Sequence, residues 1–338
     1  ELKTYYFNRI NNLKNKMVNY EITETDCITG MHEEAKKGIQ YDLSIFSPPF
    51  PKVFAYSEED ADMGNAKTWG EFILQYEFFS HALFPLIKDG RNACVHVQQV
   101  TKTKGNDGNM GLFNLRGYCI DAMEKAGFIY YGEVTIPKNP QAQSIRLKAH
   151  QLQFTQWEKD STVSRPSLAD YLLVFKKPGK NLVPVKPLES GLTRDNWITW
   201  AESEWISKEQ NNINLQYPKS VWRGIRETFC LNNRSTVENV IGGHHKTPNT
   251  KFHGDEVHMC PLQLDLIERC VLLWSNKGET VFTPFAGIGS EIIGAMIHDR
   301  NGRGMELKSD YIDELKRNCD GLISKKKESS KIVTLFDI

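Results

Sequence analysis

The stretch GETVFTPFAGIGSEIIGAMIHDRNGRGMELKSDYIDELKRN, Gly278 to Asn318, decides the fold that we expect for this chain. A short apolar run predicts a strand, Gly287 and Gly289 predict a turn, and a helical pattern begins near Ser290. Glycines at such a turn let backbone N–H groups approach a ligand, and the helix N-terminus favours a negative group. The order strand, turn, helix therefore predicts a nucleotide site.

The next strand of this stretch ends at Glu306, where an acidic side chain suits hydrogen bonding to ribose hydroxyls. An ordinary strand–helix turn with a solvated Glu306 remains the alternative for the glycine pair alone. The next glycine is Gly294, too late for the dinucleotide fingerprint GxGxxG, so a nicotinamide enzyme is the weaker interpretation.

Strand-like and helix-like segments alternate along the chain, which predicts an α/β sheet. The predicted strands are Tyr41–Phe46, Ala93–Gln98, Phe128–Ile136, Tyr171–Lys176, Thr280–Pro284 and Gly302–Glu306. The predicted helices are Glu71–Leu86, Leu264–Leu273 and Ser290–His298. The Pro- and Lys-rich stretch Lys176 to Gly191 predicts a linker, and the glycine-rich stretch Val100 to Gly117 predicts a loop that closes over substrate.

A second informative stretch, YDLSIFSPPFPKVF, covers Tyr41 to Phe54. Two successive prolines cannot donate ladder hydrogen bonds, so the strand must end at Ser47. The rigid turn that follows carries a hydroxyl, a proline-flanked carbonyl and an aromatic ring, which together suit the wall of a pocket. Taken alone, the Ser-Pro-Pro-Phe stretch can also be interpreted as a turn that simply ends the strand.

Composition limits the classes of function. The 338 residues are 40% hydrophobic, with 42 basic and 42 acidic residues, so a polyanion would have to meet a local patch. The seven cysteines are scattered without a CxxC pair, which indicates a reducing compartment, and we expect the cytoplasm. No apolar run approaches membrane-spanning length. The histidines near Cys260 match no paired ligand pattern, so we expect no metal.

Together the two stretches resemble the S-adenosylmethionine-dependent DNA amino-methyltransferases, which methylate an exocyclic base nitrogen. Their catalytic (Ser/Asp/Asn)-Pro-Pro-aromatic motif is similar to Ser47-Pro48-Pro49-Phe50, and their Phe-x-Gly-x-Gly cofactor motif is similar to Phe285-Ala286-Gly287-Ile288-Gly289. The catalytic motif comes first, which is the circularly permuted order of the β class. The variants TPFAGIGSE and CPLQ look like those of phage- or prophage-encoded members.

The resemblance implies a Rossmann-like fold, with a mixed, mainly parallel sheet, helices on both faces and an inserted target-recognition region. It divides the chain into a catalytic half (1–180), a linker and insert (181–254) and a cofactor-binding half (255–338).

The resemblance also implies the cofactor site. Asp26 would contact the adenine, the stretch Asp255 to Leu264 would line the methionine pocket, and Thr283 departs from the usual Asp before Pro-Phe. The implied cofactor-binding residues are Asp26, Phe46, His258, Pro261, Gln263, Pro284, Phe285, Gly287, Gly289, Ser290, Glu291 and Glu306.

The chemistry explains the catalytic motif. An exocyclic amine is a poor nucleophile because its lone pair is conjugated into the ring. The Ser47 hydroxyl and the Pro48 carbonyl would accept its two hydrogens, and Phe50 would stack on the base. The base must leave the duplex first, so double-stranded DNA and base flipping are implied.

The identity of the base stays open at this point. Ser47 favours cytosine N4, because family members that act on adenine N6 more often have Asp there, and adenine N6 is the alternative. A catalytically silent DNA-binding module with the same fold is a further alternative, as is a methyltransferase of RNA or of protein glutamine. Cytosine C5 methylation is excluded because the only candidate nucleophile, Cys260, precedes its proline instead of following it.

Contacts with macromolecules rest on weaker patterns. The loop that follows the predicted strand Phe128–Ile136 predicts contacts with DNA, and a solvated surface turn is the alternative. The tryptophan-rich insert also predicts contacts with DNA, and packing in the core is the alternative there. The predicted DNA-binding residues are Lys138, Arg146, Lys148, Arg194, Arg223 and Arg226. The tail Lys331 to Ile338, with Leu335 and Phe336, faintly resembles motifs that dock on sliding clamps, with an edge strand as the alternative.

Overall fold

The computed structural model describes residues 18–50, 62–137, 140, 143–144, 150–205, 262 and 264–336. Within these ranges, the side chains of Asn106 and of 325–336 are outside the description.

A seven-stranded sheet forms the centre, in the order β1-β9-β8-β2-β3-β7-β6. Its strands are β1 (Tyr20–Glu24), β2 (Tyr41–Phe46), β3 (Ile87–Gln98), β6 (Ile129–Ile136), β7 (Asp170–Lys176), β8 (Thr280–Thr283) and β9 (Asn301–Glu306). The strands from β1 to β3 in this order run parallel, whereas β7 is antiparallel to both β3 and β6. The predicted mixed, mainly parallel sheet is confirmed.

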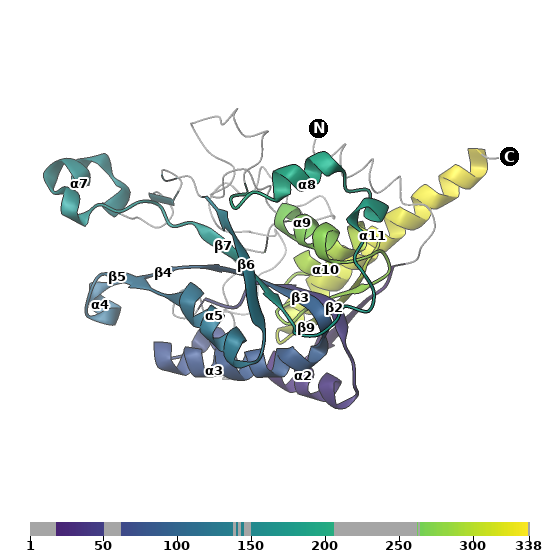
Figure 1. Cartoon of the computed structure of the whole chain (residues 1–338), viewed down its shortest axis with the longest axis horizontal. Helices are drawn as coiled ribbons and strands as arrows, with labels where there is room; N and C mark the ends of the chain where they lie inside the picture. The colour runs from purple at the N-terminus through teal and green to yellow at the C-terminus, as the bar shows by residue number, and fades with distance from the viewer. Residues whose placement is uncertain are drawn as a thin grey trace.

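Helices cover both faces of the sheet (Figure 1). One face carries α2 (Cys27–Lys36), α3 (Trp69–Leu83) and α5 (Leu115–Lys125), and the other carries α9 (Leu264–Trp274), α10 (Ser290–Ile297) and α11 (Ser309–Phe336). The shorter helices are α4 (Lys104–Asp107), α7 (Phe154–Lys159), α8 (Arg194–Trp200), η1 (Met63–Asn65), η2 (Phe84–Leu86), η3 (His150–Leu152), η4 (Ser161–Val163) and η5 (Pro187–Ser190). Because helices cover both faces of the sheet, polar groups can gather at the ends of the strands.

Strand residues alternate between two hydrophobic cores. Leu43 and Ile45 of β2 face α9 and α10, whereas Phe46 faces α3. All six residues of β2 are buried, because a central parallel strand has helices on both sides.

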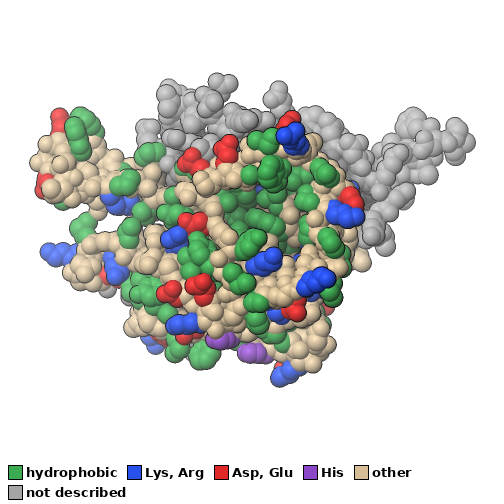
Figure 2. Space-filling view, in the orientation of Figure 1, with side chains coloured by type: hydrophobic (Ala, Val, Ile, Leu, Met, Phe, Trp, Pro, Cys, Tyr) green, Lys and Arg blue, Asp and Glu red, His purple; other side chains and the backbone are tan. Residues whose placement is uncertain are grey.

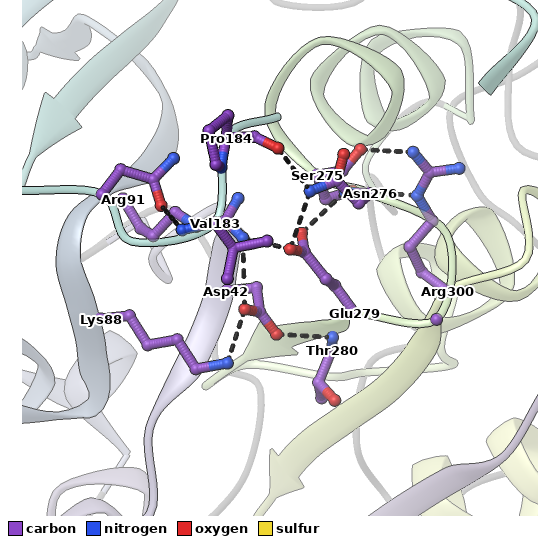
Figure 3. Close-up of polar contacts among 12 residues, drawn as sticks. Asp42, Lys88, Arg91, Val183, Pro184, Ser275, Asn276, Glu279, Thr280 and Arg300 are labelled. Atoms are coloured by element: carbon purple, nitrogen blue, oxygen red, sulfur yellow. Dashed lines mark hydrogen bonds and ion pairs between the residues drawn. The ribbon is translucent and has the colours of Figure 1, made fainter. Parts of the chain in front are cut away.

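An ion cluster fastens the amino ends of the central strands (Figure 3). The Asp42 carboxylate of β2 lies 2.6 Å from Lys88 Nζ and accepts a 3.0 Å hydrogen bond from the Thr280 N–H. The buried guanidinium of Arg91 pairs with both Asp42 and Glu279. The cluster joins parts of the chain far apart in sequence at the end of the sheet opposite Ser47.

The structure also corrects several boundaries. The stretch predicted as a loop, Val100 to Gly117, contains a β4–β5 hairpin (Val100–Lys102 with Gly111–Phe113), the short α4 and the start of α5. Strand β3 begins at Ile87 instead of Ala93. The backbone of the tail is helical through Phe336, so the edge-strand alternative is wrong there.

The helices and the cysteines of the described residues have two further properties. None of their helices combines the length and apolar character needed to cross a membrane. Five buried cysteines among them are free, namely Cys27, Cys94, Cys119, Cys270 and Cys319.

Candidate active site

The Ser-Pro-Pro-Phe motif follows directly on β2, at the carboxyl end of the strand. Ser47 and Pro49 are half-buried, and Pro48 is buried. Phe50 is only 8% exposed and packs in the core that includes α3, so in this structure its ring has little free surface. Ligands of open α/β sheets bind at such carboxyl ends, so the motif has the expected position.

Ser47 is held by a residue that the sequence did not single out. Its hydroxyl donates a 3.1 Å hydrogen bond to the main-chain carbonyl of His96 and lies 3.2 Å from His96 Nδ1. On the far side of the ring, His96 Nε2 lies 3.2 Å from Asp170 Oδ2. Three strands thus contribute one polar side chain each to a single row.

The glycine turn after β8 has the backbone that only glycine adopts readily. Gly287 has φ 49° and Gly289 has φ 91°, both in the left-handed region. A Cβ on Gly289 would lie 2.7 Å from Leu315 Cγ of α11. The Gly287 N–H donates a 2.7 Å hydrogen bond to Glu306 Oε2, which ties the turn to the end of β9.

Glu306 organises the end of β9. Its Oε1 atom accepts 3.0 Å hydrogen bonds from the N–H groups of Leu307 and Lys308. Burial raises the pKa of Glu306 above its usual range, against the opposing effect of these hydrogen bonds. A carboxylate has about four acceptor sites, so three backbone donors leave capacity for a ligand hydroxyl.

Asp26 lies two residues beyond Glu24, the residue of β1 that pairs with Glu306. The Thr25 N–H donates to the main-chain oxygen of Glu306 at 2.9 Å, and Asp26 Oδ1 caps α2 by accepting from the Thr29 N–H at 2.8 Å. Burial raises the pKa of Cys27 well above its usual range, and the charges of Asp26 and Glu306 add to the effect. The structure therefore brings together two residues that the resemblance assigns to the cofactor.

The start of α10 contains buried polar atoms. Ser290 Oγ and Thr283 Oγ1 are buried and have no hydrogen-bond partner among the described residues. Burial raises the pKa of Glu291 to about 8, and the charge of Glu306 contributes less. Buried hydroxyls normally have hydrogen-bond partners. Two unpaired hydroxyls, the glycine turn and the Glu306 carboxylate, which is placed to bind ribose hydroxyls, therefore fit a polar ligand such as a nucleoside cofactor.

Aromatic rings join the two motifs. The Phe46 ring lies 5.9 Å from the Phe285 ring, and Phe79 of α3 stacks on Phe285 at 5.0 Å. Strands β2 and β8 pair directly, with Leu43 opposite Val281. Phe46 itself is fully buried, so its side chain serves this packing. Pro284 is likewise buried between β8 and the glycine turn.

Several predicted residues fall outside the described residues, so their predictions stay predictions. These are His258, Pro261, Gln263, Lys138, Arg146, Lys148, Arg223 and Arg226, together with the side chains of Leu335 and Phe336. Arg194 is exposed at the start of α8. On the face seen in Figure 2, basic and acidic side chains are interspersed around a central apolar area. Within the described ranges, no group of three or more His, Cys, Asp or Glu residues could hold a metal.

His96 and Asp170 had a signal in the sequence. In β2, Leu43 and Ile45 alternate toward the α9 face, and Ser47 continues that alternation. In β3 and β7 the same face carries Cys94 and Leu172, each two residues from a polar group at the strand end. Polar residues that follow the apolar residues on the same face of neighbouring strands indicate a functional site. The sequence alone does not show which strands are neighbours, so this signal can be read only once the strand order is known.

Comparison with known proteins gives matches over most of the chain. A family model described as DNA methylase, for N6 and N4 methyltransferases, matches residues 41–317. The chain is 24% identical over 239 residues to the Type II methyltransferase M.BglI of Bacillus subtilis, covering 68% of this chain and 53% of that protein. It is 25% identical over 164 residues to the orphan methyltransferase M.BamHII of Bacillus amyloliquefaciens, covering 46% and 57%. The chain thus spans about half the length of the curated relatives it matches.

Two solved structures share the fold. TTHA0409 of Thermus thermophilus, which was assigned as a DNA modification methylase, aligns with a TM-score of 0.57 at 17% identity, covering 90% of this chain and 95% of that one. That protein has also been solved in complex with S-adenosyl-L-methionine. The cytosine-N4-specific PvuII DNA methyltransferase aligns with a TM-score of 0.55 at 10% identity, covering 94% of each chain.

Proposed function

The chain belongs to the DNA methylase family, and from this premise we propose that it transfers a methyl group from S-adenosylmethionine to an exocyclic amine of a base in double-stranded DNA. One observation carries the proposal: the Ser-Pro-Pro-Phe motif and the glycine turn follow paired strands, β2 and β8. A methyl donor held at one motif would therefore lie beside an amine held at the other.

S-adenosylmethionine supplies the methyl group in this proposal. Asp26 and Glu306 would bind the adenosine, and the turn at Gly287 and Gly289 would let main-chain N–H groups approach the cofactor. The buried Ser290 hydroxyl, unpaired among the described residues, would gain a hydrogen-bond partner. The complex of TTHA0409 with the same molecule supports this assignment.

Ser47 and Pro48 would activate the base. The serine oxygen and the Pro48 carbonyl would each accept one hydrogen of the target amine, which favours a pyramidal nitrogen with an available lone pair. The two prolines keep these acceptors in place before the base arrives. The nitrogen would then attack the methyl carbon directly and release a proton, without a covalent intermediate on the protein.

Cytosine N4 is the base position that we propose. Ser47 at the first motif position supports it, as does the shared fold with the cytosine-N4-specific PvuII enzyme. Adenine N6 is the second candidate, because the same pair of acceptors would serve its amine. The chain order also supports the permuted β class, since β2 with its Ser-Pro-Pro-Phe motif precedes β8 with its glycine turn.

The proposal is tested by incubating the protein with plasmid DNA and S-adenosylmethionine and digesting the DNA to nucleosides for mass spectrometry. We expect N4-methylcytosine with the native sequence and a loss on the order of a hundredfold with Ser47→Ala. Ser47→Thr is the matched control, because it keeps the hydroxyl. Gly287→Asp should abolish binding of S-adenosylmethionine in calorimetry.

Each other outcome has a distinct meaning. N6-methyladenine would keep the mechanism and replace the base. Methylation of RNA in preference to duplex DNA would overturn the substrate. Full activity of Ser47→Ala would remove Ser47 from the catalytic site. Binding of S-adenosylmethionine without any methylated nucleoside would move the protein to another substrate, and no binding of S-adenosylmethionine would leave a silent DNA-binding module.

A further inference from the structure

A row of three polar side chains crosses three neighbouring strands at the candidate active site. Ser47 follows β2, His96 lies near the end of β3, and Asp170 begins β7. All three continue the strand face that packs against α9 and α10. His96 is 4% exposed and Asp170 is fully buried, so the row runs from the half-buried serine into the protein interior.

The register of the sheet builds this row. Ile45 of β2 lies opposite Cys94 of β3, so the next position on the same face sets Ser47 beside His96. In the antiparallel pair β3–β7, Gln98 lies opposite Asp170 and His96 opposite Leu172, so His96 and Asp170 are diagonal neighbours on one face. The backbone of the sheet therefore fixes the positions of all three residues.

The contacts define where the hydroxyl proton of Ser47 goes. The Asp170 carboxylate, 3.2 Å from Nε2, favours the imidazole tautomer with its proton on Nε2. Nδ1 is then an acceptor, and it lies 3.2 Å from Ser47 Oγ. The second nearby acceptor, at 3.1 Å, is the main-chain carbonyl of the same His96.

We propose that His96 and Asp170 are positioning residues that hold the Ser47 hydroxyl as a hydrogen-bond acceptor for the target amine. Among the described residues, the two acceptors near the Ser47 hydroxyl both belong to His96, so the proton points toward β3. The lone pairs of Oγ then face away from His96, toward the position of the base. This inference rests on the proposed function, because the group that Ser47 receives is the amine of a DNA base.

The consequence is chemical. A free serine hydroxyl can donate as well as accept, and a donated proton would compete with the lone pair that the amine needs. A serine whose proton is engaged elsewhere can only accept. Asp170 lies 3.2 Å from His96 Nε2 in the buried interior, where electrostatic attraction between the two groups is weakly screened, and this attraction helps to hold the orientation of the imidazole.

A double-mutant cycle tests the inference with the full chain. The rate of methyl transfer to plasmid DNA is measured at saturating substrate for the native sequence, Ser47→Ala, His96→Leu and the double variant. We expect His96→Leu to lower kcat on the order of tenfold or more while KM for DNA and Kd for S-adenosylmethionine change less than about twofold. In the Ser47→Ala background, His96→Leu should cost nothing further.

A conservative variant separates positioning from a structural role. His96→Asn keeps an acceptor near the site of Nδ1, so it should recover most of the kcat that His96→Leu loses, although both remove the ring. Equal losses from His96→Leu in both serine backgrounds, or no recovery in His96→Asn, would overturn the inference. An inactive native protein would overturn the proposed function and this inference with it, whereas an active one with independent losses overturns the inference alone.

A readout without activity checks the tautomer. Long-range nitrogen–proton NMR of the imidazole should show the His96 proton on Nε2, and Asp170→Asn should increase the Nδ1-protonated form. A proton on Nδ1 in the native sequence would contradict the proposed orientation of Ser47.

Discussion

Glu291 gives the sharpest prediction about the cofactor-binding half. Its side chain is 5% exposed at the start of α10, and burial raises its pKa from 4.5 to about 8. The folded protein therefore holds a proton on this carboxyl at neutral pH. Glu291→Gln keeps the shape of the protonated side chain and removes its titration.

The magnitude follows from linkage. One factor of ten in proton affinity corresponds to about 1.4 kcal/mol, so a rise from 4.5 to about 8 corresponds to about 5 kcal/mol. Because the pKa is raised on folding, this stability is fully present below pH 4.5 and is lost as pH rises through 8. The native sequence should lose this stability at alkaline pH, and Glu291→Gln should keep it.

The assay is urea unfolding of both proteins at pH 5 and pH 8.5. The advantage of Glu291→Gln should be about 4 kcal/mol larger at pH 8.5 than at pH 5. Comparison between two pH values cancels any constant difference in packing between Glu and Gln. An equal difference between the two proteins at both pH values would mean that folding does not raise the pKa of Glu291, and the prediction would be wrong.

Two further predictions concern the glycine turn and a buried arginine. Gly289→Ala should lower affinity for S-adenosylmethionine by roughly tenfold or more in calorimetry, because its Cβ would meet Leu315 at 2.7 Å and its φ is 91°. Gly38→Ala, where φ is also positive but the space is open, is the control and should leave the affinity unchanged. Arg300→Met should lower the free energy of unfolding by roughly 3 kcal/mol in urea, because Arg300 is fully buried and bonds several acceptors. The matched change of an exposed arginine, Arg317→Met, should cost under about 1 kcal/mol, and equal losses would contradict the role of burial.

Local patterns in the sequence predicted the centre of the fold. The proline pair after Phe46 and the glycine pair before Ser290 have direct effects on the backbone, so β2, β8 and α10 end or begin close to where they were predicted. The pairing of β2 with β8 does not follow from these local patterns, because it joins parts of the chain far apart in sequence. The assignment of these two turns to a catalytic motif and a cofactor motif came from the resemblance to a known family and not from hydrophobic periodicity.

Other parts escaped prediction for physical reasons. Strand β1 has two glutamates among its five residues and no clean apolar alternation, and its place in the sheet is shown by its pairing with β9. His96 lies 49 positions from Ser47, so their contact depends on strand register. Phe50 is 8% exposed and belongs to the core cluster that includes α3, and its stacking on a flipped base stays a prediction.

Methyl transfer to an exocyclic amine can be followed with S-adenosylmethionine that carries a deuterated methyl group. The protein is incubated with unmethylated plasmid DNA and this donor, and the nucleosides are analysed by mass spectrometry. We expect the deuterated methyl group to appear intact on the N4 atom of cytosine, and only with a functional Ser47. Label on a ring carbon, or on no nucleoside while the protein binds the donor, would contradict the claim that this site methylates an exocyclic amine of DNA.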